Sequence, residues 1–113
     1  MGKRKERRTP MRLHVRVWGM DSTGKLFNVP ARTMDITPVS ARLDGIWQRL
    51  VRGAVIGVAH GRSQARFRVS WVGRIGTPNQ GQIGIQSLEP GKYIWGMALE
   101  RTLDQEVEVS LAS

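Results

Sequence analysis

The stretch QARFRVSW, residues 64–71, alternates polar and apolar side chains from end to end. A period of two is typical of a β-strand that has one face on a core and the other in solvent. The stretch LHVRVW, residues 13–18, shows the same alternation. Both stretches are therefore predicted to be half-buried strands, and the other elements of the fold are predicted from their positions relative to these two.

Four further strands are predicted, over residues 25–37, 41–44, 54–60 and 82–88. Turn-forming sequences lie between strands, namely DSTG at 21–24, GRS at 61–63 and GTPNQG at 76–81, and they favour antiparallel neighbours. Six short strands in succession predict an all-β fold, a six-stranded antiparallel β-barrel whose closure removes exposed edges and whose interior is filled by side chains. One short helix is predicted over residues 93–103, packed over an end of the barrel.

The four tryptophans are interpreted from their positions in this pattern. Trp47, Trp71 and Trp95 are expected in the core or capping it, and Trp18, at a strand end beside Gly19, is the one candidate for an exposed position.

The composition of the 113 residues bounds the chemistry. The chain has no cysteine, which excludes thiol catalysis, thiolate metal sites and disulfides, and its two histidines are isolated, which argues against a metal centre. Neither Glu89 nor Glu100 has an acid or histidine partner placed for acid-base chemistry, so no enzyme is expected. With no long apolar run, no transmembrane segment is expected, and the predicted location is cytoplasmic.

The net charge of +9 is unevenly distributed. Residues 1–16 hold seven Lys and Arg against one Glu, a net charge of +6, which leaves +3 for the remainder. Such a segment attracts any polyanion, whether nucleic acid, acidic lipid or nucleotide phosphate, and long-range attraction does not choose among them. Residues 1–6 are predicted to be a flexible basic arm.

Arg8 and Arg12 flank Pro10 just before the first strand, and Arg7 precedes them. Proline disfavours helix and leaves a bend at which the two guanidinium groups can converge. Their donors suit phosphate oxygens and the O6/N7 edge of guanine. The alternative is that these arginines are solvated charges or partners of surface acids.

A second element, Asp35-Ile36-Thr37-Pro38-Val39-Ser40, closes the next apolar stretch. Asp35 and Thr37 lie on one side of an extended chain, where a carboxylate can accept from guanine N1 and N2 or orient an arginine. The alternative is an Asx or Ser/Thr turn that ends a strand. Taken together, the two elements predict a site for a guanine nucleotide.

The sequences RRTPMR at 7–12 and DITPVSARL at 35–43 resemble the two signatures of the PilZ domain, the bacterial receptor module for cyclic di-GMP. These signatures are R-x-x-x-R in an N-terminal loop and [D/N]-x-S-x-x-G after a strand pair. Thr37 stands in place of the serine, and Ser40 in place of the glycine. VSWVG at 69–73 and GQIGIQSLEP at 81–90 resemble the fifth and sixth strands of the family.

This resemblance implies a PilZ-type barrel over residues 7–104, followed by a tail at 105–113. It implies that cyclic di-GMP binds on the outer surface and that the arginine loop changes its order on binding, which signals to a protein partner. The residues expected to contact the ligand are Arg7, Arg8, Arg12, Asp35, Thr37 and Ser40. Neither a cofactor nor a specific nucleic acid is expected.

Ser40 adds a side chain where the family relies on glycine, and a positive φ at this position would strain it. Two alternatives therefore stay open. One is a PilZ-like interaction module that has lost the ligand, and the other is a basic nucleic-acid-binding barrel.

Overall fold

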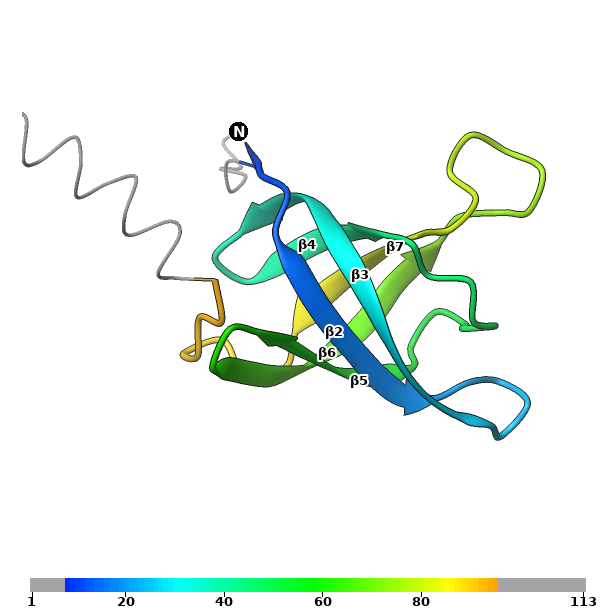
Figure 1. Ribbon diagram of the computed structural model, residues 1–113, viewed down its shortest axis with the longest axis horizontal. Helices are drawn as coiled ribbons and strands as arrows, with labels where there is room; N and C mark the ends of the chain where they lie inside the picture. The colour runs from blue at the N-terminus through cyan, green and yellow to red at the C-terminus, as the bar shows by residue number, and fades with distance from the viewer. Residues whose placement is uncertain (1–7, 96–113) are drawn as a thin grey trace, which may run out of the picture.

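The computed structural model describes residues 8–95, which form an all-β structure (Figure 1). The strands are β1 (Thr9–Pro10), β2 (His14–Met20), β3 (Leu26–Thr37), β4 (Ser40–Asp44), β5 (Val55–His60), β6 (Ser63–Val72) and β7 (Gln82–Ser87). The arm at 1–6, the tail at 105–113 and most of the helix predicted over 93–103 lie outside the described residues. Within residues 8–95, no helix is long and apolar enough to cross a membrane.

Six of the strands close into a barrel. The sheet order is β1-β3-β2-β5-β6-β7-β4, and an additional pairing of β3 with β4 joins the two sides of the sheet. Every pairing is antiparallel, so the predicted six-stranded antiparallel barrel is confirmed. The short strand β1 was not predicted, and it lies outside the barrel on an edge of β3.

Alternating apolar side chains fill the barrel interior, as the sequence pattern predicts. Val15 and Val17 of β2 and Phe67 and Val69 of β6 are all buried. At one end Trp95 is 1 % exposed; its ring lies 5.4 Å from that of Phe67, and its Nε1–H donates to the carbonyl of Thr37. At the other end the buried side chains of Ile46 and Leu50 close the interior. Function must therefore lie on the outer surface or the rims.

The positions of the tryptophans correct part of the prediction. Trp95 is in the core, as expected, but the prediction for Trp47 is wrong, because this side chain is 66 % exposed. Its loop turns Ile46 and Leu50 inward to cap the barrel, which leaves Trp47 on the outside against Gly81.

Trp18 and Trp71 are both half-buried on the outer face of the barrel, each over a glycine of the next strand. A Cβ on Gly57 would lie 2.2 Å from Trp18, and one on Gly84 would lie 2.1 Å from Trp71. The two glycines therefore make room for the indole rings, which shield the bare backbone.

The strand connections alternate between the two ends of the barrel (Figure 1). We call the end formed by residues 8–13, 38–39, 61–62 and 88–95 the arm end. The far end is formed by the connections at 21–25, 45–54 and 73–81.

Thr33 joins residues 8–13, which we call the arm segment, to the barrel. It is fully buried, and its hydroxyl accepts from the Leu13 N–H at 2.8 Å and donates to the carbonyl of Met11. The Thr33 N–H donates to the carbonyl of Leu13 at 3.0 Å. One side chain thus satisfies the backbone groups in the gap between β1 and β2.

The variant Thr33→Val keeps the shape of this side chain but removes both hydroxyl bonds. We expect the free energy of unfolding to fall by about 1–3 kcal/mol, because the partners stay partly buried and unsatisfied. Urea denaturation measures this. Thr23→Val is the control, since the Thr23 hydroxyl donates to Asp21 in an exposed turn where water can replace it. Equal losses in the two variants would contradict the role assigned to Thr33.

Candidate nucleotide-binding site

The backbone of the arm segment is held along the edge of β3. Thr9 pairs with Ile36 and Pro10 with Asp35, and the Met11 N–H donates to the carbonyl of Met34 at 3.2 Å. Proline has no N–H to offer a ladder, and an outside strand is where a sheet tolerates it. This pairing places Arg8 at the end of β3 that carries the acid-hydroxyl element.

Asp35 is the centre of an ion-pair network between the arm and the barrel. Arg8 Nη1 donates to its Oδ1 at 3.0 Å, and Arg42 Nη2 donates to its Oδ2 at 2.8 Å. The Asp35 side chain is only 10 % exposed, whereas Arg8 and Arg42 are 58 % and 36 % exposed. Of the two roles considered for this carboxylate, the geometry matches the orientation of arginines.

Arg42 was missed as a site residue, although the sequence contains the signal for it. A two-residue turn at Pro38 and Val39 pairs Thr37 with Ser40, and counting outward then pairs Ile36 with Ala41 and Asp35 with Arg42. Since Ile36 and Ala41 face the core, the next pair along must face outward.

The two hydroxyl residues lie together beside the turn. Thr37 Oγ1 and Ser40 Oγ are 2.7 Å apart and share a hydrogen bond, and the Val39 N–H donates to Thr37 Oγ1 at 3.2 Å. Thr37 thus forms the Ser/Thr turn that was considered as an alternative, while Ser40 stays half-buried. No residue but glycine has a positive φ among those described, so Ser40 is not strained in place of glycine.

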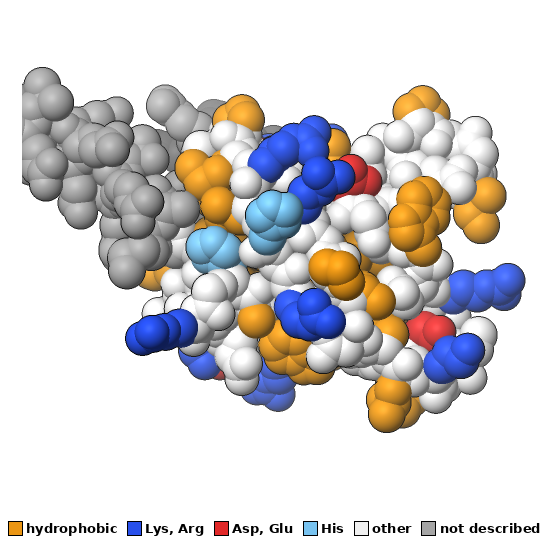
Figure 2. Space-filling view, in the orientation of Figure 1, with side chains coloured by type: hydrophobic (Ala, Val, Ile, Leu, Met, Phe, Trp, Pro, Cys, Tyr) orange, Lys and Arg blue, Asp and Glu red, His pale blue; other side chains and the backbone are white. Residues whose placement is uncertain are grey.

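Arg12 stands apart from the network. Arg12 is exposed and forms no ion pair with any of residues 8–95, and Arg7 lies outside the described residues. Figure 2 shows Lys and Arg side chains gathered over β2 and β3, where Arg12, Arg16 and Arg32 are exposed. The structure therefore joins Arg8 to Asp35 and Thr37 to Ser40, adds Arg42, and leaves Arg12 without a partner within the described part of the chain.

This arrangement retains hydrogen-bond donors for an anion. A guanidinium has five N–H groups, and each of Arg8 and Arg42 donates one of them to Asp35. The Nε of Arg42 is buried and has no partner within residues 8–95. Two guanidinium groups against one carboxylate leave a local excess of positive charge, which suits a phosphate or the acceptor edge of guanine.

Among residues 8–95, the two carboxyls with a shifted pKa lie outside this site. The hydroxyl of Thr23 holds the pKa of Asp21 below its usual value, and the backbone N–H of Arg66 does the same for the pKa of Glu89. Both groups are solvent-exposed in turns or at strand ends, and neither has the raised pKa of a general acid. Across residues 8–95, no cluster of three or more His, Asp or Glu side chains is placed to hold a metal ion.

Comparison with known proteins does not assign the chain to a family. A scan against protein-family models found no match to the chain, and a search of curated proteins found no relative.

Double-mutant cycles on stability test the Asp35 network. We expect a coupling free energy of about 0.2–1 kcal/mol for the Arg8–Asp35 pair, because Arg8 is well exposed. The Arg42–Asp35 pair should couple more strongly, by roughly 1–3 kcal/mol, because it is shorter and less exposed. The measurement is chemical denaturation of the single and double alanine variants. A stronger coupling for Arg8 than for Arg42 would contradict the geometry.

Proposed function

We propose that this protein is a receptor for cyclic di-GMP, which binds the dinucleotide on the outer surface of the barrel at the arm end. The observation that carries the proposal is the Asp35 carboxylate, which holds an arginine of the arm and an arginine of the barrel on one surface. The choice of cyclic di-GMP as the ligand rests on the resemblance of the arginine and acid-hydroxyl elements to the PilZ signatures.

The chemistry of the ligand fits the donors present. Each phosphate of the dinucleotide carries one negative charge, and each guanine presents O6 and N7 as adjacent acceptors. Arg8 and Arg42 are both partly exposed and each donates one of its N–H groups to Asp35, so other donors remain for a ligand, and exposed Arg12 would complete the set. Arg7 would assist from the arm.

Asp35 would act mainly through the arginines. Both of its oxygens already accept from guanidinium groups, so a direct bond to guanine N1 or N2 would require one arginine to leave. A carboxylate that fixes the guanidinium groups of two arginines lowers the entropy cost of ligand binding, because those side chains are already oriented.

Thr37 and Ser40 would form the floor of the site beside the turn. The hydroxyl of Thr37 is buried and already engaged, so the half-buried hydroxyl of Ser40 is the better placed of the two to meet a ligand. Because Ser40 has an ordinary extended conformation, its effect on affinity would come from the volume of its side chain.

The signal would pass through the arm. The backbone of Thr9, Pro10 and Met11 is already paired with β3, so ligand binding would act mainly on the side chains of Arg8 and Arg12 and on the residues before them. Ordering costs about 1–2 kcal/mol per residue in backbone entropy, which limits the affected segment to a few residues. A protein partner in the cytoplasm that recognises the ordered arm would respond to ligand binding. No enzymatic step would be needed.

Titration calorimetry with cyclic di-GMP and cyclic di-AMP tests the proposed ligand. Binding should favour cyclic di-GMP, because arginine donors match guanine O6 and N7 but would oppose the N6 amino donor of adenine. Equal affinities for the two dinucleotides, or no binding of either, would refute the proposal.

A matched pair of variants tests the site. Arg12→Ala should weaken binding by roughly 1.5–3 kcal/mol, the loss expected for a charge-assisted bond, whereas Arg16→Ala should have little effect. Both side chains are exposed and four residues apart, so the two variants remove the same charge from the same face. Similar losses at both positions would indicate diffuse attraction instead of a defined contact.

A further inference from the structure

Exposed hydrophobic side chains are concentrated at the far end of the barrel. Among residues 8–95, eight large hydrophobic residues are exposed, and of these only Tyr93 lies at the arm end. The others are Met20, Leu26, Trp47, Val51, Val55, Val72 and Ile75, and they lie in or next to the three far-end connections. Single exposed apolar residues are ordinary, but a group of seven at one end of a small domain indicates an interaction surface.

The three connections are joined into one surface. The Ser22 N–H of the β2–β3 turn donates to the carbonyl of Arg49 in the β4–β5 loop at 2.7 Å. Trp47 of that loop lies against Gly81 at the end of the β6–β7 loop. Between these two loops is a hollow of about 490 Å³, whose lining includes Trp47, Val72 and Ile75.

The fold itself does not require this exposure. In the β4–β5 loop, Ile46 and Leu50 turn inward and seal the barrel, while Trp47 and Val51 turn outward. Ile75 is 88 % exposed and Leu26 is 75 % exposed, so neither contributes appreciably to the core. Polar residues would serve equally well at these positions if solvent were their only neighbour.

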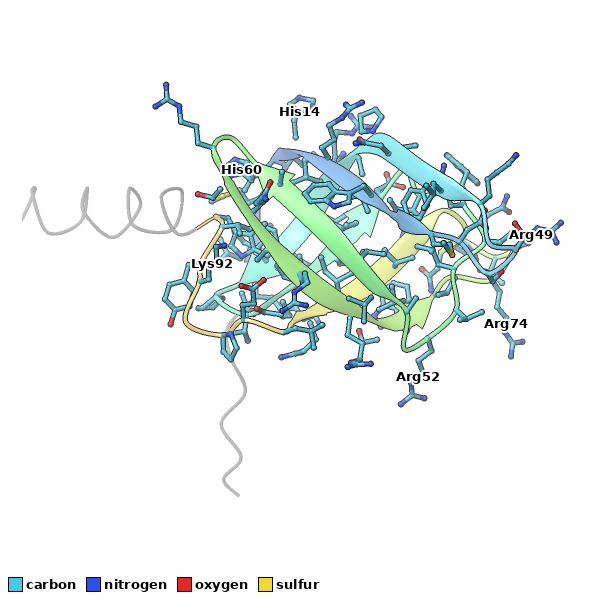
Figure 3. The ribbon with its side chains drawn as sticks, turned by 90° about the horizontal axis from the view of Figure 1, so that it is seen from below. His14, Arg49, Arg52, His60, Arg74 and Lys92 are labelled. Carbon is cyan, nitrogen blue, oxygen red and sulfur yellow. The ribbon has the colours of Figure 1, made fainter. Side chains whose placement is uncertain are left out.

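Basic side chains surround the apolar group. Lys25, Arg49, Arg52 and Arg74 belong to the same three connections, and Figure 3 shows the three arginines at this end, away from His14, His60 and Lys92. The acids nearby are Asp21 and Asp44. Asp21 Oδ1 accepts from Thr23 and from the backbone N–H of Lys25, which ties this carboxylate into its own turn.

We propose that the far end docks on the surface of an anionic lipid bilayer. Trp47, Leu26 and Ile75 would enter the interfacial region, and the four basic side chains would contact acidic headgroups. Tryptophan favours this interface because it combines an apolar ring with a polar N–H, and arginine and lysine keep their charge at headgroup level over an apolar stem. Each basic residue near an acidic leaflet adds to the attraction.

The surface fits a bilayer better than a second copy of this chain. A two-fold dimer through this end would place Arg49, Arg52 and Arg74 of one copy against the same basic surface of the other, and like charges in a desolvated contact are costly. The apolar side chains also come from three different connections, and a fluid interface can adapt to such a set. The docking would leave the arm end, with the proposed ligand site, facing away from the membrane.

Co-sedimentation of the full chain with vesicles tests the proposal, using phosphatidylcholine alone and mixed with phosphatidylglycerol. Wild type should partition onto the mixed vesicles. The double variant Leu26→Ser/Ile75→Ser should partition at least about tenfold more weakly, because two largely exposed side chains lose their burial in the interface. Arg49→Gln/Arg74→Gln should weaken partitioning about fivefold for each charge removed, and only on the mixed vesicles.

Two controls separate this surface from the arm end of the barrel. Tyr93→Ser removes an exposed apolar side chain from the arm end, and Arg62→Gln removes an exposed charge there; both should leave partitioning unchanged. If the serine double variant fails to fold, the arginine pair decides the result. The proposal is overturned if wild type does not bind the mixed vesicles, if the far-end variants bind like wild type, or if the arm-end controls lose as much.

Discussion

The pairing of β3 with β4 across Pro38 and Val39 is the constraint on which the rest of the structure depends. It joins the two sides of the sheet, so without it the barrel would keep two open edges. It also fixes a register, in which Ile36 and Ala41 face the core and Asp35 and Arg42 face outward. A slip of one residue would turn the Asp35 carboxylate toward an apolar interior, so core packing and site geometry are specified together.

The second half of β3 also binds the arm segment. The same part of the strand therefore positions the arm segment and carries the carboxylate of the site. Thr33 and Asp35 lie within three residues of one another, and each binds the arm segment through its side chain. Asp35 is nearly buried, and both of its carboxylate oxygens accept from guanidinium groups. An anion that draws Arg8 away would leave Arg42, whose contact is the shorter and less exposed of the two, as the partner of Asp35.

Period-two alternation was sufficient to predict the strands and the closed barrel, because Phe67 and Val69 alternate with arginines along β6. Arg8 and Asp35 were predicted as site residues, but their direct pairing and the part played by Arg42 depend on the register of a hairpin, which residue types alone do not fix. Trp47 was wrongly predicted to be buried because tryptophan is a large apolar residue that usually packs in or on a core. In this structure its neighbours Ile46 and Leu50 already fill the end of the barrel. The strand β1 has no alternation to reveal it, since it is two residues long and contains Pro10.

The antiparallel order also explains why the two proposed surfaces are separate. In this barrel each strand runs antiparallel to the next strand in the sequence, so successive connections emerge at opposite ends, and residues 21–25, 45–54 and 73–81 share one end. The arm and the β3–β4 turn must then share the other end. A packed interior, closed by Trp95 at one end and by Ile46 and Leu50 at the other, separates the two surfaces. The two surfaces share no residue. Substitutions that change the charge or the apolar area at one end can therefore be made without removing a contact at the other end.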